Sequence, residues 1–142
     1  MKTEVIPARS EHCPMLAANM DEDGREFIRK YYEVEAEQGL SDALAASTLC
    51  WTILIDGEAA GMFGCTERGQ VWLTTAPAIE RAKLRFIRQS RSYLAQMLGQ
   101  CGGSLYATVH KGNKLLMGWL MWSGFEIKGE VGDFWLCVFQ SR

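Results

Sequence analysis

Long apolar runs are missing from this sequence of 142 residues. The longest apolar stretch, Leu115–Trp122, is interrupted by Gly118 and is far shorter than the roughly 18 residues that a membrane span needs. Met1–Arg9 also has no apolar stretch of secretory length. We therefore expect a chain with no membrane span and a cytoplasmic location.

A surplus of basic charge is also missing. The 15 lysines and arginines stand against 17 acidic residues, which gives a formal net charge of −2. Proteins that bind nucleic acid neutralise many phosphates and are usually strongly basic, so we expect no nucleic-acid partner. The hydrophobic fraction of 48% and the chain length fit a single folded domain covering residues 1–142.

Metal ligands are scarce. The chain has two histidines and five cysteines, and no two cysteines form a Cys-x-x-Cys pair. A structural zinc site needs four such ligands at close spacing, so we expect no metal. The odd number of cysteines, three of them in apolar strand-like segments, indicates thiols kept in a reducing compartment. These residues are His12, His110, Cys13, Cys50, Cys65, Cys101 and Cys137.

The pattern that is present predicts an α/β fold. Helical and strand-like segments follow one another, and Gly39 is placed to end an early helix. A long helix opens at Pro77 and separates two strands, which is typical of a parallel crossover in an otherwise antiparallel sheet. We therefore expect a central, mostly antiparallel sheet with one parallel pair and helices on both faces. The expected strands are Val5–Ile6, Leu49–Ile55, Ala59–Cys65, Val71–Thr75, Leu105–Val109, Phe125–Lys128 and Phe134–Phe139, and the two later helices are Pro77–Leu98 and Lys114–Trp122.

Asn113, a short helix and the closing pair Gly124-Phe125 follow the fifth expected strand. This order resembles the GNAT superfamily of acetyl-CoA-dependent N-acetyltransferases, and implies an acyl-CoA N-acyltransferase fold for the whole chain. Val71-Trp72-Leu73, Phe86-Ile87-Arg88 and Trp119–Phe125 together are similar to a narrower family of tailed-phage proteins that includes the internal virion protein A of short-tailed phages. That narrower resemblance implies a virion-associated location if the chain is phage-encoded.

The resemblance implies acetyl-CoA or CoA as cofactor. In the family, backbone groups of the fourth strand pair with pantetheine, which here means Leu73, Thr74 and Thr75. Arg81 would reach a phosphate, although a solvated basic face is the alternative. Asn113 would contact pantetheine, and a helix cap is its alternative. Active members usually carry an Arg/Gln-x-x-Gly-x-Gly/Ala loop before the long helix, whereas the segment from Thr75 to Arg81 has no glycine.

The catalytic groups are fewer than the family pattern asks for. His110 closes the fifth expected strand and could act as a general base, because its ordinary pKa of about 6.5 suits neutral pH. The alternative is a polar loop residue. The tyrosine that often protonates the leaving thiolate falls by spacing at Leu120, which has no proton to give.

The helix Leu115–Trp122 is apolar on nearly every side. Such a helix is either packed in a core or used as an interface, here with a protein partner or a second copy of the chain. Two functions therefore stay open. One is a degenerate acetyltransferase fold with a virion-assembly or protein-interaction role, and the other is an active acetyl-CoA-dependent N-acetyltransferase acting on an unidentified amine.

Overall fold

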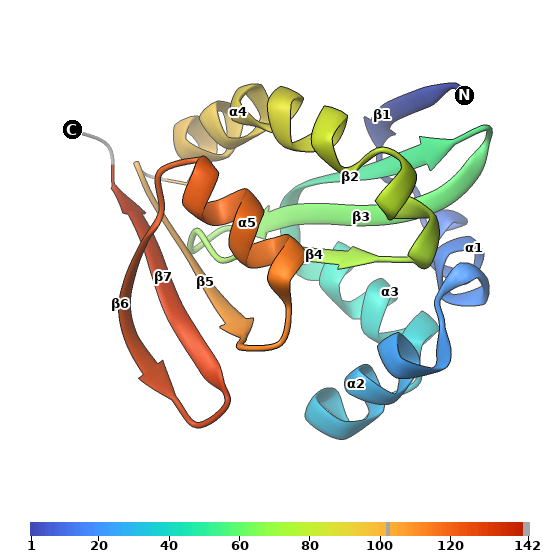
Figure 1. Cartoon of the computed structure of the whole chain (residues 1–142), viewed down its shortest axis with the longest axis horizontal. Coiled ribbons are helices and arrows are strands. Elements are labelled where there is room, and N and C mark those ends of the chain that lie inside the picture. Colours follow the sequence, from blue (N-terminus) through green and yellow to red (C-terminus); the bar gives the residue numbers. More distant parts are fainter. Residues whose placement is uncertain (102, 141–142) are drawn as a thin grey trace. The chain divides into compact units, whose positions relative to one another are not determined.

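The computed structural model describes residues 1–101 and 103–140, with the backbone alone at Gln140 (Figure 1). The chain divides into two compact units that are interleaved in sequence. The first unit comprises Met1–Gly64 and Leu73–Ala82, and the second comprises Cys65–Trp72 and Lys83–Arg142. A single domain over residues 1–142 stays a prediction.

The chain combines strands and helices, as the sequence pattern indicates. No helix in the described part of the chain combines the length and the apolarity that crossing a membrane requires. In chain order the elements are β1 (Thr3–Pro7), α1 (His12–Asn19), α2 (Glu22–Tyr32), α3 (Ala36–Ala46), β2 (Ser47–Ile55), β3 (Glu58–Thr66), β4 (Val71–Thr75), the 3-10 helix η1 (Pro77–Arg81), α4 (Lys83–Gln100), β5 (Ser104–His110), α5 (Lys114–Trp122), β6 (Glu126–Val131) and β7 (Phe134–Gln140).

The first unit is built on a sheet with the strand order β1-β2-β3-β4. β1 runs antiparallel to β2, from Thr3 opposite Ile55 to Pro7 opposite Trp51. The ring of Trp51 stacks on that of Phe63 from the adjacent strand, with centroids 5.3 Å apart. α3 packs against α1, α2 and β2, which closes the core of this unit.

The boundary between α2 and α3 differs from the expected one. α2 ends at Tyr32, because Glu33 takes the left-handed conformation with φ of 58° and its N–H bonds to the carbonyl of Arg29. The expectation that Gly39 ends a helix is wrong, since α3 runs straight through it. A Cβ at Gly39 would lie 3.0 Å from Cγ2 of Ile28, so the glycine lets α3 lie close to α2.

The long helix expected from Pro77 begins later than its proline. Ala76, Ile79 and Ala82 are all buried, and this three-residue spacing matches the 3.0 residues per turn of a 3-10 helix. The segment Pro77–Arg81 accordingly forms η1, and Ala82, with φ of −134°, separates it from α4. The α-helix therefore starts at Lys83.

The second unit contains an antiparallel sheet with the strand order β5-β7-β6. β5 pairs with β7 along its whole length, from Ser104 opposite Gln140 to His110 opposite Phe134. α4 packs against β5 and α5, and Phe86 of α4 meets Trp119 of α5 with ring centroids 5.3 Å apart. The core of this unit includes Phe86, Met97, Leu105, Ala107, Val109, Trp119, Leu120 and Cys137.

The sheets together give the mixed α/β architecture that the sequence predicts. The expected parallel strand pair, however, is not formed within residues 1–101 and 103–140. Parallel pairing there is an isolated bridge between Gln70, in the turn before β4, and Tyr106 of β5. The N–H of Tyr106 donates to the carbonyl of Gly69 at 2.9 Å.

His12 is a buried titratable group in the first unit, with 2% of its surface exposed. Its Nδ1 accepts from the N–H of Arg9 at 3.0 Å and contacts the hydroxyl of Thr52 at 2.8 Å. Burial lowers the pKa of His12 below 6.5, and the charge of Arg9 lowers it further. The neutral imidazole is therefore the form that the fold holds.

We expect His12→Asn to flatten the acid side of the stability profile. The unfolded chain binds the His12 proton at higher pH than the folded chain, so the stabilisation is complete above pH 6.5 and is lost as the pH falls through the folded-state pKa. Asparagine keeps an acceptor oxygen near Nδ1 but does not titrate. Thermal unfolding at about pH 7.5 and about pH 5 should show a smaller decrease in Tm for the variant than for the wild type. Equal decreases would contradict this reading of His12.

Candidate functional site

Two backbone hydrogen bonds fix how β4 pairs with β3. The N–H of Thr66 donates to the carbonyl of Gln70 at 3.0 Å, and the N–H of Ala76 donates to the carbonyl of Ala60 at 2.8 Å. Both bonds belong to one antiparallel register, in which every second residue turns its N–H and C=O toward the partner strand. Gln70, Ala76 and the even-numbered residues between them therefore face β3.

The odd-numbered residues of β4 turn their backbone groups the other way. β4 is the edge strand of its sheet, so no adjacent strand in the described residues takes the outward N–H and C=O groups of Leu73 and Thr75. The side chain of Leu73 is buried, whereas that of Thr75 is half-exposed. The backbone of Thr74 faces β3, which leaves its half-exposed side chain as the group available for a cofactor contact.

The segment after β4 is a packed turn, not an open loop. Ile79 N–H donates to the carbonyl of Ala76 at 3.1 Å, and Ala82 N–H donates to that of Ile79 at 2.9 Å. These two donors are thus used inside the turn, and Pro77 has no N–H. The segment does not present the row of backbone donors that cradles a phosphate in a glycine-rich loop.

Arg81 ends this turn and points at the hairpin between β2 and β3. Its Nη2 lies 3.3 Å from Oδ2 of Asp56, and both side chains are mostly exposed. The N–H of Lys2 holds the pKa of Asp56 below its ordinary value, and Arg81 adds to the effect. Water screens an exposed ion pair of this kind and makes it weak, so Arg81 can exchange Asp56 for another anion at little cost.

Asn113 is the N-cap of α5. Its Oδ1 accepts from the N–H of Leu116 at 3.1 Å, which satisfies one of the unpaired donors at the start of the helix. The structure therefore shows Asn113 as a helix cap, which was the alternative to a pantetheine contact. A pantetheine contact through its remaining polar groups stays a prediction.

His110 lies at the end of β5 beside this cap. Its carbonyl accepts from the N–H of Asn113 at 2.9 Å, and its Nδ1 accepts from the N–H of Gly112 at 3.1 Å. Its ring meets Phe134 edge-on, with centroids 5.4 Å apart. Because Nδ1 serves as an acceptor, the neutral ring carries its proton on Nε2. In this tautomer Nε2 is a donor, so a general-base role for His110 requires the ring to give up its bond to Gly112.

α5 has one buried face and one exposed face. Leu116, Trp119 and Leu120 are buried, so Leu120, at the position of the family's tyrosine, is enclosed in the core of the second unit. Met121 and Trp122 are 36% and 44% exposed. The expectation that this apolar helix packs in a core is correct for its buried face. It does not apply to Met121 and Trp122.

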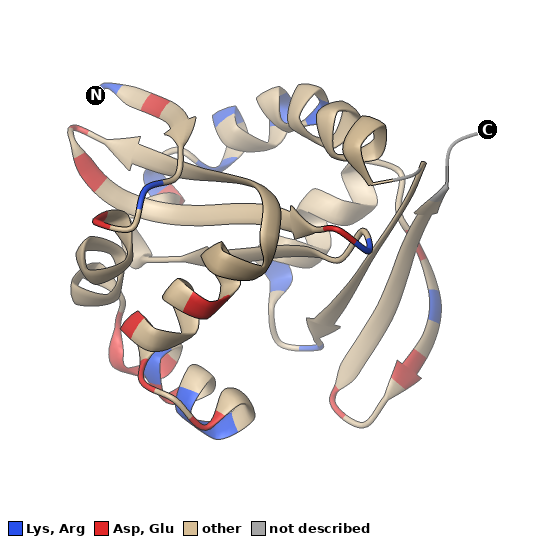
Figure 2. Ribbon diagram, turned by 180° about the vertical axis from the view of Figure 1, so that it is seen from behind, with Lys and Arg blue, Asp and Glu red and all other residues tan. Residues whose placement is uncertain are grey.

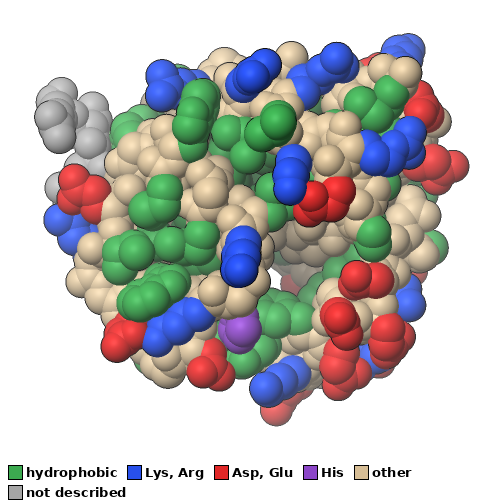
Figure 3. Space-filling model, in the orientation of Figure 1, with side chains coloured by type: hydrophobic (Ala, Val, Ile, Leu, Met, Phe, Trp, Pro, Cys, Tyr) green, Lys and Arg blue, Asp and Glu red, His purple; other side chains and the backbone are tan. Residues whose placement is uncertain are grey.

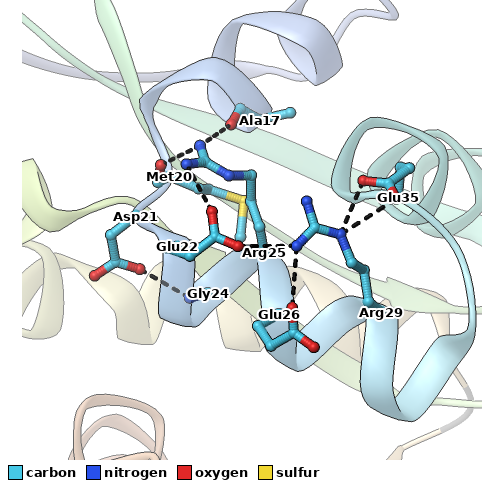
Figure 4. Close-up of polar contacts among 9 residues, drawn as sticks. All are labelled: Ala17, Met20, Asp21, Glu22, Gly24, Arg25, Glu26, Arg29 and Glu35. Atoms are coloured by element: carbon cyan, nitrogen blue, oxygen red, sulfur yellow. Dashed lines mark hydrogen bonds and ion pairs between the residues drawn. The ribbon is translucent and has the colours of Figure 1, made fainter.

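Salt bridges to arginine partly neutralise the acidic side chains on and next to α2. Figure 3 shows acidic side chains gathered over this helix, and Figure 2 shows basic residues among them. Arg29 reaches the carboxylates of Glu22, Glu26 and Glu35, with nitrogen–oxygen distances of 3.0–3.1 Å (Figure 4). These carboxylates raise the pKa of Arg29, Glu22 first. The cluster therefore fixes the end of α2 to the start of α3.

Metal ligands are not grouped in the part of the chain that the structure describes. No three side chains of histidine, cysteine, aspartate or glutamate come together there in a geometry that could hold a metal ion. The absence of a metal cofactor remains a prediction from the sequence.

Comparison with known proteins identifies the fold. No family model matches the chain, and no curated protein does. Among solved structures, the PaiA N-acetyltransferase of Thermoplasma acidophilum in complex with coenzyme A is 13% identical, with a TM-score of 0.71 over 99% of this chain and 100% of that one. The chain has the GNAT acetyltransferase fold.

Two further structures agree. A GNAT-family acetyltransferase of Streptococcus pneumoniae is 12% identical, with a TM-score of 0.68 over 98% of this chain and 99% of that one. The aminoglycoside acetyltransferase AAC(6')-Ib in complex with coenzyme A is 14% identical, with a TM-score of 0.67 over 98% and 95% of the two chains. At such identities the likeness shows the GNAT fold alone, and the narrower resemblance to phage virion proteins stays a prediction.

The predicted site residues of this GNAT fold are divided between the two units. Leu73, Thr74, Thr75 and Arg81 belong to the first unit, whereas His110 and Asn113 belong to the second. Within the second unit His110 and Asn113 share a hydrogen bond. The alternation of outward backbone groups along β4 was not predicted, because the sequence alone does not give the strand register.

We expect the two tryptophans of α5 to differ sharply in their effect on stability. Trp119 is fully buried against Phe86, so Trp119→Ala should lower the free energy of unfolding by about 3–5 kcal/mol. Trp122 is 44% exposed and has the guanidinium of Arg91 4.3 Å from its ring, so Trp122→Ala should cost about 1 kcal/mol or less. Urea unfolding of the two variants measures the difference. Similar losses would contradict this division of α5.

Proposed function

We propose that this chain binds a CoA thioester and transfers its acyl group to an amine. The observation that carries the proposal is the open edge of β4, with outward backbone groups at Leu73 and Thr75. It is supported by structures of the same fold that were solved in complex with coenzyme A, among them the PaiA and AAC(6')-Ib enzymes.

The chemistry of pantetheine fits an open strand edge. Its two amides are spaced along a flexible chain and can pair with a backbone edge as an added strand does. Such pairing would hold the thioester in a fixed place, and positioning alone can supply about 7–11 kcal/mol of a barrier. The side chain of Leu73 is buried, which helps to hold the strand in place. The chain's main contribution would then be alignment.

Few side chains are placed to carry out the proton transfers of this reaction. Leu120 is buried and has no proton to donate. The Nδ1 of His110 is used by Gly112. Water would therefore carry the protons, unless His110 exchanges its partner when substrate binds. Because η1 does not form a glycine cradle, we expect CoA binding to depend on β4 more than on this turn.

Replacing Thr75 by proline tests whether the open edge of β4 binds CoA. The N–H of Thr75 faces away from β3, so Thr75→Pro removes an outward donor without removing a bond of the sheet. Loss of one such hydrogen bond should weaken CoA binding by about 3–10-fold. Thr75→Ala keeps the N–H and is the matched control, with affinity close to that of the wild type. Calorimetric titration with acetyl-CoA measures all three proteins.

Three results would count against this proposal. A wild-type chain that gives no heat with millimolar acetyl-CoA does not bind the cofactor. Equal affinities for Thr75→Pro and Thr75→Ala would remove β4 from the site. A large drop in Tm for Thr75→Pro would show that its N–H belongs to the sheet, and the register argument would then fail.

The second candidate function is non-catalytic: the chain keeps the GNAT fold but transfers no acyl group. It is favoured by the buried Leu120 and by the packed turn η1, which take the place of the family's acid and of its glycine loop. Its contact surface would be the exposed face of α5, with Met121 and Trp122, and its simplest partner is a second copy of the chain. A role in assembling a phage virion is the form that the sequence resemblance favours.

Sedimentation of the wild type and of Trp122→Ala tests this alternative. A dimer formed through α5 should dissociate at a concentration at least about 10-fold lower in the wild type than in the variant, because buried tryptophans carry much of the energy at interfaces. Leu84→Ala is the control, since Leu84 is an exposed apolar residue on α4. A wild-type monomer at millimolar concentration, or equal effects of both substitutions, would reject the dimer.

A further inference from the structure

Two cysteine thiols meet inside the second unit. The sulfur atoms of Cys65, near the end of β3, and Cys101, just after α4, are 3.0 Å apart. Cys65 is fully buried, whereas Cys101 keeps 9% of its surface exposed. The Cys101 thiol also lies within 3.2 Å of the carbonyl oxygen of Thr66, to which it can donate. A disulfide holds its sulfurs about 2 Å apart, so a shift of roughly 1 Å separates this contact from a bond.

The backbone on both sides holds the two thiols in place. The N–H of Cys101 bonds to the carbonyl of Met97 at 2.8 Å, which continues the helical pattern of α4 through Cys101. On the other side, the turn after Cys65 is held against β5 by the bond from Tyr106 to Gly69. Gly69 has φ of +91°, and a Cβ there would lie 2.5 Å from the carbonyl oxygen of Ser104, so only glycine allows this approach.

We propose that Cys65 and Cys101 form an oxidation site that hydrogen peroxide converts into an intramolecular disulfide. The thiolate of Cys101, the more exposed partner, attacks one peroxide oxygen, becomes a sulfenic acid and releases the other oxygen as water after protonation. The Cys65 sulfur then attacks the sulfenic sulfur, the S–S bond forms, and the sulfenic oxygen leaves as a second water. The two thiols supply the two electrons and the two protons that reduce one peroxide to two waters.

The other cysteines are poorer candidates for this reaction. Burial raises the pKa of Cys50 to about 12, with a contribution from nearby Cys13. Burial also raises the pKa values of Cys13 and Cys137. Because the thiolate is the attacking species, a raised pKa makes these three thiols harder to activate. A reversible disulfide of this kind is compatible with a reducing compartment, where such bonds are transient.

The disulfide would fix the turn end of the β3–β4 hairpin to the end of α4. It closes a loop between residues 36 positions apart, which restricts the unfolded chain. A loop of this length should raise the Tm by roughly 10 °C if the native geometry accepts the bond without strain. The oxidised chain should therefore unfold at a higher temperature than the reduced chain, and a reductant should reverse the change.

Mass spectrometry of the full chain tests the site. The reduced protein is treated with a small excess of peroxide, the remaining thiols are alkylated, and the chain is cleaved after Glu58 and at basic residues so that Cys50 is separated from Cys65. We expect a mass loss of two hydrogen atoms, the loss of two of the five alkylatable thiols, and one linked peptide pair that contains Cys65 and Cys101. The rise in Tm should appear in the same sample.

Single substitutions give the order of the steps. In Cys65→Ser the sulfenic acid on Cys101 has no second thiol to react with, so it should accumulate and be trapped by a 1,3-dione reagent. Cys101→Ser should give no disulfide and little sulfenic acid, because Cys65 is fully buried. Cys137→Ser is the control and should still form the linked pair. A disulfide between other cysteines, added oxygen without a linked pair, or an unchanged thiol count would overturn the proposal, as would an oxidised chain with a lower Tm.

Discussion

The pairing of β3 with β4 determines which backbone groups of this protein are open to a ligand. Hydrogen bonds at both ends of the pair set one register, and that register turns Leu73 and Thr75 outward. On its other side β3 approaches β2 closely, since a Cβ at Gly64 would lie 2.3 Å from the carbonyl oxygen of Leu49. Glycine at this position of β3 thus allows the close approach of β2. The candidate site depends on this geometry more than on any reactive side chain.

The polar residues around the family's catalytic positions have structural tasks. Asn113 caps α5, and His110 accepts from the turn that precedes this cap. Arg81 pairs with Asp56 beside a tight hairpin. The bonds of Asn113 and Arg81 can be exchanged for a ligand at little cost, because helix caps and exposed ion pairs are weak. A protein with this arrangement can keep its fold whether or not it has kept its chemistry.

The sequence predicted the order of elements well and their ends less well. Alternating apolar strands and glycine-marked hairpins gave the strands from β2 to β7, and the segment from Asn113 to Phe125 gave the fold. Gly39 was misread because a glycine that permits close helix packing looks the same in a sequence as one that ends a helix. The helix start at Pro77 was misread because proline suits the first turn of a helix, and the sequence alone does not show that this turn is a 3-10 helix that ends before Ala82.

The site was predicted in outline only. A strand pattern locates Leu73, Thr74 and Thr75, but which of them turns its amide outward follows from hydrogen bonds to β3, far along the chain. The exposed and buried faces of α5 likewise depend on the packing of Phe86 against Trp119. The contact between Cys65 and Cys101 joins residues on different elements, so no local pattern could indicate it.

The interleaving of the two units has a consequence for how the protein is made. The ribosome delivers Cys65–Trp72 before α4 and β5 exist, so this short turn leaves the exit tunnel without the partners that later hold it. The first unit, in turn, is completed only when Leu73–Ala82 emerges after that turn. Neither unit can be excised as one continuous piece of chain. A gene fragment that ends between Gly64 and Leu73 would therefore leave each unit without one of its two segments.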